Sequence, residues 1–67
     1  MDKQQEENKA LLEYMIHHNE HHMEELSELA DAIGNPASSF ITEALKDLKS
    51  GNMKLQEALD LFIKGEA

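Results

Sequence analysis

A chain of 67 residues without cysteine can form one small domain, and it can hold neither disulfides nor thiolate metal sites. Its six lysines and fourteen acidic residues give a formal net charge of −8, which repels nucleic acids and anionic membrane surfaces. We therefore expect a cytoplasmic protein with no leader sequence that binds neither nucleic acid nor membrane. Oligomerisation is expected as well, because a core this small seldom supplies more than about 3–5 kcal/mol.

The stretch from residue 6 to residue 33 contains no proline or glycine, and its apolar side chains recur with alternating steps of three and four residues. This spacing places them on one face of a helix, so we expect an amphipathic helix over about 6–33. The expected stripe comprises Leu12, Met15, Asn19, His22, Leu26, Leu29 and Ile33, widened by Ile16, Met23 and Ala30.

The residues Gly34, Asn35 and Pro36 have the chemistry of a turn between helices. Glycine suits a left-handed C-terminal cap, the asparagine side chain can cap the next helix, and proline is tolerated at the first helical position. Because a turn at 34–36 is short, the second helix must run antiparallel to the first. The sequence therefore predicts an all-α helical hairpin that forms one domain over residues 1–67.

A second amphipathic helix is expected over about 37–64. Its stripe keeps its phase across residues 50–52, which favours one continuous helix. The alternative is a break at 50–52, because Gly51 inside a helix costs about 1 kcal/mol relative to alanine. The stripe comprises Ile41, Ala44, Leu48, Gly51, Leu55, Ala58 and Phe62, with Leu45, Asn52, Leu59 and Ile63 beside it.

Both apolar faces are wider than the seam that a single partner helix can cover. The remainder must meet another protein surface, and a homodimeric four-helix bundle is the simplest solution. Ala44, Gly51 and Ala58 recur every seven residues and would let a neighbouring backbone approach closely. They are equally consistent with small residues that are merely tolerated in a core.

All four histidines lie within six residues, as His17, His18, His21 and His22. In a helix they occupy an arc of roughly 140° that also contains Glu25, since successive residues are about 100° apart. The cluster holds two pairs with i,i+4 spacing, the spacing by which zinc peptidases present two imidazoles to one ion. The histidine cluster is therefore a candidate metal site.

Imidazole and carboxylate ligands without thiolate suit divalent zinc, nickel, cobalt, copper or iron. The expected metal ligands are His17, His18, His21, His22 and Glu25. Phasing turns His18 and His22 inward and leaves the other two histidines more exposed. One helix rarely encloses an ion, so a further ligand is expected from water, from Asp47 or Glu57, or from the cluster of a second copy. Tyr14 projects toward the histidines and could hydrogen-bond an imidazole or act as a ligand.

Two polar residues, Asn19 and His22, interrupt the stripe of the first helix. The hairpin places them opposite Gly51 and Asn52, so a buried polar layer of Asn19, His22 and Asn52 could fix register and oligomeric state. Alternatively, Gly51 leaves room beside His22 for a water, an ion or a small ligand.

The sequence contains no phosphate-binding loop, no nucleophile in a catalytic context and no di-iron carboxylate pattern, so we expect no enzyme. It favours a small metal-binding protein for storage, delivery or sensing. The alternative is a structural hairpin or interaction module that docks a partner protein through its remaining apolar face. Its histidines would then be structural or pH-responsive.

Overall fold

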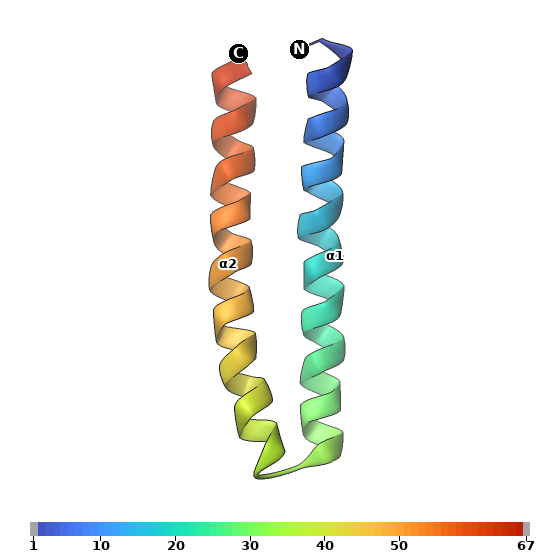
Figure 1. Ribbon diagram of the computed structural model, residues 1–67, viewed down its shortest axis with the longest axis vertical. Helices are drawn as coiled ribbons and strands as arrows, with labels where there is room; N and C mark the ends of the chain where they lie inside the picture. The colour runs from blue at the N-terminus through green and yellow to red at the C-terminus, as the bar shows by residue number, and fades with distance from the viewer. Residues whose placement is uncertain (1, 67) are drawn as a thin grey trace.

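The computed structural model describes the backbone of residues 2–66 and the side chains of residues 2–65. Two helices, α1 (Lys3–Ile33) and α2 (Ala37–Glu66), lie side by side and antiparallel (Figure 1). The Cα trace measures 49 × 16 × 10 Å, and the predicted all-α hairpin is confirmed. α2 continues through Gly51 without a break. Within residues 2–66, neither helix combines the length and hydropathy that a membrane span requires.

Both ends of α1 are closed by short-range hydrogen bonds. The side chain of Asp2 accepts a 2.8 Å hydrogen bond from the backbone N–H of Gln5, which satisfies one donor of the first turn. At the other end, the N–H of Gly34 donates to the carbonyl of Ala30 at 3.1 Å. Gly34 has φ +79° and ψ 175°, a backbone conformation that only glycine adopts without strain.

The start of α2 differs in detail from the expected capping. α2 begins at Ala37, so Pro36 precedes the helix instead of occupying its first position. The Asn35 side chain accepts a 2.7 Å hydrogen bond from the hydroxyl of Ser38. The backbone N–H of Ser38 donates to the carbonyl of Gly34 at 3.0 Å. The backbone of the turn thus provides the bond that Asn35 was expected to provide.

The two helices meet along a seam with the heptad spacing of a coiled coil. On α1 the seam consists of the buried or half-buried residues Leu12, Ile16, Asn19, Met23, Leu26 and Ala30. On α2 it consists of Ile41, Leu45, Asn52, Leu55, Leu59 and Phe62. The core of the hairpin is this single seam.

The predicted stripe of α1 agrees with the observed seam at Leu12, Asn19 and Leu26, but it was wrong by one residue at the positions between them. Met15 and Leu29 were expected near its centre, but they are 50% and 47% exposed. Ile16 and Ala30 were expected at its edge, but each is only 5% exposed. The same shift occurs on α2.

On α2, the difference in buried apolar area between the predicted and the observed positions explains the shift. On α2 the predicted phase centres on Ala44 and Ala58, whereas the observed phase buries Leu45 and Leu59. A fully buried leucine contributes about 1.5–3 kcal/mol relative to an exposed one, far more than an alanine can. α2 therefore turns these two leucines toward α1 and leaves Ala44 and Ala58 outside, whereas α1 follows with Ile16, Met23 and Ala30.

A polar layer interrupts the seam halfway along the hairpin. Asn19 Nδ2 donates to Asn52 Oδ1 at 3.0 Å, and Asn52 Nδ2 donates to the carbonyl of Ile16 at 3.2 Å. Both asparagines of the predicted layer are present, but His22 is not. The shifted phase turns His22 to the rim of the seam, where its side chain is 58% exposed.

Gly34→Ala should destabilise the hairpin by about 1–3 kcal/mol, because a Cβ is strained at this φ and ψ. A Cβ at Gly34 would meet no other atom within 4 Å, so the loss would come from the backbone alone. The matched control is D-alanine at position 34, introduced by chemical synthesis, which accepts positive φ and should retain the stability of the glycine chain. Urea denaturation at one protein concentration measures both. Equal losses for the two alanines would contradict this explanation.

Asn52→Ala should destabilise the hairpin by about 1–3 kcal/mol, because it leaves the amide of Asn19 without its acceptor in the seam. Replacing both asparagines by leucine should restore or raise the stability, since it removes both polar groups together. Thermal and urea denaturation of the single and double variants distinguish the two effects. A double variant less stable than Asn52→Ala would show that the layer stabilises the fold in its own right.

Candidate functional site

The two sides of the hairpin differ in chemistry. On one side, the groove between the helices is lined by Asn19, His22, Met23, Asp47, Leu48, Gly51, Asn52 and Leu55. On the other side, the grooves are lined by residues that include Glu13, Glu20, Glu24, Lys49 and Gln56. We call the second side the acidic side. Three glutamates of α1 therefore lie away from the groove that contains His22.

The side that contains His22 extends along the whole hairpin. Helical periodicity adds to it the residues that lie seven positions from His22 and from Gly51. We call this surface the apolar face and define it by Met15, His22, Leu29, Ala44, Leu48, Gly51, Leu55 and Ala58. The leucines and methionine on it are about half exposed or half-buried, and nothing in the described chain covers them.

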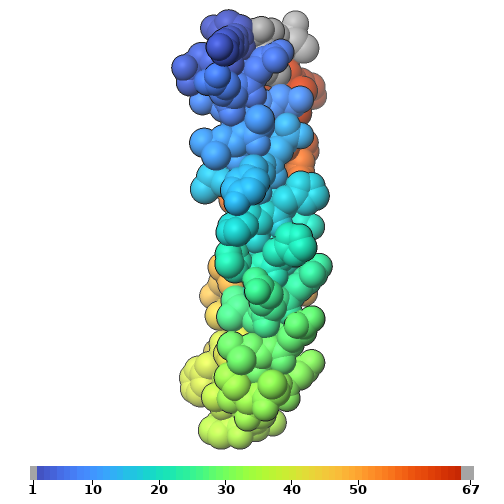
Figure 2. Space-filling model, turned by 90° about the vertical axis from the view of Figure 1, so that its right-hand side faces the viewer, coloured from blue at the N-terminus to red at the C-terminus, as the bar shows by residue number. Residues whose placement is uncertain are grey.

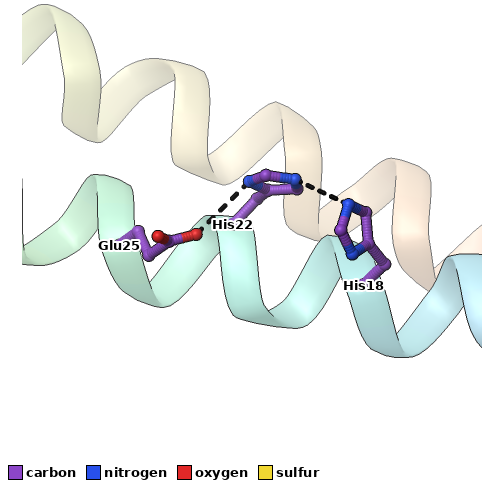
Figure 3. A network of polar contacts seen from close by, with 3 residues as sticks. All are labelled: His18, His22 and Glu25. Carbon is purple, nitrogen blue, oxygen red and sulfur yellow. Dashed lines mark hydrogen bonds and ion pairs between the residues drawn. The ribbon is translucent and has the colours of Figure 1, made fainter.

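Three side chains of α1 form a line of polar contacts beside this face (Figure 3). Nε2 of His22 lies 2.9 Å from Nε2 of His18, one turn earlier. Nδ1 of His22 lies 3.4 Å from a carboxylate oxygen of Glu25, one turn later. The i,i+4 and i,i+3 spacings produce both contacts without help from α2.

The carboxylate determines how the two rings share their protons. Glu25 only accepts hydrogen bonds, so the contact with His22 favours the tautomer in which Nδ1 of His22 carries the hydrogen. In that tautomer Nε2 of His22 holds a lone pair, which can accept a hydrogen bond from Nε2–H of His18. The lone pair of His22 therefore points toward His18, where an ion could replace the shared hydrogen.

Ring contacts hold the two imidazoles further in place. The ring of Tyr14 stacks on His18 with 5.4 Å between centroids and 17° between planes. The rings of His18 and His22 meet edge to face at 4.4 Å and 88°. Tyr14 was expected to hydrogen-bond an imidazole, but it instead supports His18 through its ring face.

His17 and His21 lie apart from this pair. His17 lines a groove on the acidic side with Glu13, Glu20 and Gln56, and His21 lies on the exposed surface of α1. Figure 2 looks onto α1, which covers most of the view, with α2 emerging only at its edges. Within residues 2–65, neither histidine makes a hydrogen bond, ion pair or ring contact, so the predicted cluster separates into one associated pair and two isolated imidazoles.

The structure thus brings together three of the five predicted ligands, His18, His22 and Glu25. The three do not converge on one point. His18 and His22 point their Nε2 atoms toward each other, whereas Glu25 contacts the far nitrogen of His22. Within the described residues, no group of three or more histidine, aspartate or glutamate side chains is placed to hold a metal ion. Of the candidates for a further ligand, Asp47 lines the groove beside His22, while Glu57 pairs with Lys54 at 3.7 Å.

One residue near the site did not stand out in the sequence. Leu11 lies seven positions before His18 and is 58% exposed, so the exposed apolar surface continues along α1 toward its N-terminal end. The seven-residue spacing shared by Leu11, His18 and Glu25 could have revealed it.

The family of the chain emerges from comparison with known sequences. No curated protein and no solved structure matches this chain. Residues 8–62 match the family described as "Domain of unknown function (DUF8180)". The match includes the turn, most of both helices, the asparagine layer and all four histidines, and the chain therefore belongs to this family.

Proposed function

We propose that this hairpin is a small cytoplasmic protein that binds a divalent transition metal for storage, delivery or sensing, with His18 and His22 as its ligands. The observation that carries the proposal is the approach of the two Nε2 atoms to 2.9 Å while Glu25 contacts the other nitrogen of His22. Two converging imidazole nitrogens form a chelating pair for zinc, nickel, cobalt, copper or iron.

The distance between the ring nitrogens is close to that of a bound pair. Two nitrogens on a tetrahedral zinc ion lie about 3.3 Å apart, because each metal–nitrogen bond measures about 2.0–2.1 Å. The Nε2 atoms of His18 and His22 would need to separate by only about 0.4 Å from their present contact. Both rings must also turn so that their lone pairs meet at one ion, and the i,i+4 spacing allows this by side-chain rotation.

Glu25 has the position of a supporting carboxylate. Metal-binding imidazoles commonly donate their second N–H to a carboxylate, which orients the ring and makes the ligand nitrogen more basic. The 3.4 Å contact between Glu25 and Nδ1 of His22 has this arrangement. Glu25 is therefore proposed to position His22, whereas the sequence alone suggested that it binds the ion directly.

His18→Ala combined with His22→Ala should abolish tight binding of Zn²⁺, Ni²⁺ or Co²⁺, because it removes both ligand nitrogens. Glu25→Gln should weaken binding by roughly 10–100-fold, as loss of a supporting residue commonly does. The matched control is His17→Ala combined with His21→Ala, which removes two histidines of the same helix and should leave the dissociation constant within about threefold. Isothermal titration of metal-free protein without a histidine tag measures all four chains.

Two results would contradict the metal site. One is wild-type affinity no tighter than tens of micromolar for all three ions. The other is equal loss of affinity in the two double-alanine variants, which would mean that the ions bind the acidic surface and histidines collectively.

We also infer that the chain is a homodimer that forms a four-helix bundle. The chain exposes 5269 Å², about 1,000 Å² more than the roughly 4,300 Å² expected for a compact monomer of its mass. A stable interface of ordinary size covers about 800 Å² on each partner. The excess area is thus about what one further copy would cover.

The apolar face is the surface that best fits such an interface. Its half-exposed leucines and methionine line one side of the hairpin, and the glutamates of the acidic side point elsewhere. Two chains that meet through it would therefore avoid most of the repulsion expected from a charge of −8 on each.

Met15→Glu should weaken the dimer at least tenfold, since burying a charge without a partner costs more than 1–2 kcal/mol, or roughly one order of magnitude in affinity. Met53→Glu is the matched control, because Met53 lines the acidic side and is 68% exposed. Sedimentation equilibrium with and without a chelator measures both. A wild-type chain that stays monomeric at high concentration, with metal and without it, would favour docking of a different protein on this face.

A further inference from the structure

The histidine pair lies at the middle of the hairpin, and the asparagine layer shows which part of α2 is opposite it. Asn19 and Asn52 share a level because they hydrogen-bond across the seam at 3.0 Å. In an antiparallel pair, residue 20 of α1 is therefore level with Gly51 of α2. His18 and His22 lie two residues to either side of that level.

The pattern of α2 is nearly the same in both directions from Gly51. Ala44 and Ala58 lie seven residues before and after it. Asp47 lies four residues before it and Lys54 three residues after it. A two-fold axis at this level, perpendicular to the helices, would place Ala44 against Ala58 of a second copy. The same axis would place each Asp47 near the Lys54 of the other copy. Two ion pairs would then form between the chains.

Two pairs of residues on α1 are symmetric about the same level. Leu11 and Leu29 lie nine residues before and after residue 20, so the axis places each Leu11 against Leu29 of the other copy. It also places each His18 against His22 of the other copy. A two-fold interface requires a surface that is complementary to itself, and the apolar face has that property on both helices.

We propose that two copies of the chain pack through their apolar faces about a two-fold axis perpendicular to the helices, with α1 against α1 and α2 against α2. His18 and His22 of both copies then form one four-imidazole site for a divalent transition metal at the centre of the dimer. This inference rests on the metal-binding function and the homodimer proposed above, and it adds the arrangement and the complete ligand set.

The chemistry of the pair favours a site shared between copies. One chain offers two converging nitrogens, and no larger ligand group exists among its described residues. Zinc and cobalt commonly take four protein ligands in a closed tetrahedral site, and two copies of the pair supply that number. Each Glu25 lies on the side of His22 away from His18, so it can support its imidazole without entering the site.

A two-fold axis parallel to the helices gives a different result. It would place α1 of one copy against α2 of the other, so each histidine pair would lie near Gly51 of its partner. The two pairs would then stay apart and would form two separate sites with two imidazoles each. Metal stoichiometry and the orientation of the chains distinguish these arrangements.

The first test combines zinc titration with sedimentation equilibrium of the full chain. The expected result is one Zn²⁺ for every two chains and a dimer at least tenfold tighter with zinc than without it. His18→Ala with His22→Ala should remove this gain, and His17→Ala with His21→Ala should keep it. One zinc per chain would overturn the shared site and leave the metal-binding function intact. Absence of tight binding for Zn²⁺, Ni²⁺ and Co²⁺ alike would overturn both.

The second test measures the orientation of the two chains in the zinc-loaded dimer. The chain contains no cysteine, so Ala37→Cys next to the turn gives one nitroxide label on each copy. The proposed axis puts the two labels about 40 Å apart, because position 37 lies fourteen residues from Gly51 and a helix rises about 1.5 Å per residue. An axis parallel to the helices would bring them to within about 20 Å across the bundle. A distance in the shorter range would overturn the proposal.

A charge exchange tests the ion pairs beside Gly51. Lys54→Asp should weaken the dimer roughly three- to tenfold. At both symmetry-related places in the interface, Asp47 would then meet an aspartate of the other copy instead of a lysine. Adding Asp47→Lys to it should restore affinity to within about threefold of wild type. Lys46→Asp is the control for net charge and should have less effect than Lys54→Asp. Failure of the exchange to restore affinity would overturn this arrangement of α2 against α2.

Discussion

The hydrogen bond between Asn19 and Asn52, together with the short turn at 34–36, favours the register on which the rest of the hairpin depends. An otherwise apolar heptad seam could slip by one turn, but a slip would bury both amides against leucines and leave them unpaired. An unpaired buried amide costs about 1–3 kcal/mol, a large share of the stability of so small a domain. The register in turn places Gly51 level with the middle of the histidine pair.

The candidate site combines local helix geometry with this register. The contacts among His18, His22 and Glu25 come from spacings of three and four residues on one helix, so they need no tertiary structure. The seam decides where this line of side chains lies. Because Ile16 and Met23 turn toward α2, His22 lies at the rim of the seam and on the apolar face, where a second chain can reach it.

The sequence predicted the two helices, their antiparallel order and the asparagine pair, because each follows from periodicity and turn chemistry. It failed on the phase of the seam. Both apolar faces are broad enough for two phases, and periodicity alone placed Met15 in the stripe and Ile16 at its edge, whereas the structure buries Ile16. The same ambiguity put His22 into the buried layer, whereas the structure leaves it exposed. His18 was expected to turn inward with His22, but all four histidines are exposed.

The sequence by itself determined the elements of this protein: two amphipathic helices, a glycine-containing turn and four histidines phased on one helix. These properties are local, since they depend on residues a few positions apart. Only the tertiary structure decided which half of each apolar face is buried and which histidines lie beside the half that remains open. That choice depends on how much apolar area is buried when the two helices meet, and on α2 burial of Leu45 and Leu59 in place of Ala44 and Ala58 favours the observed arrangement.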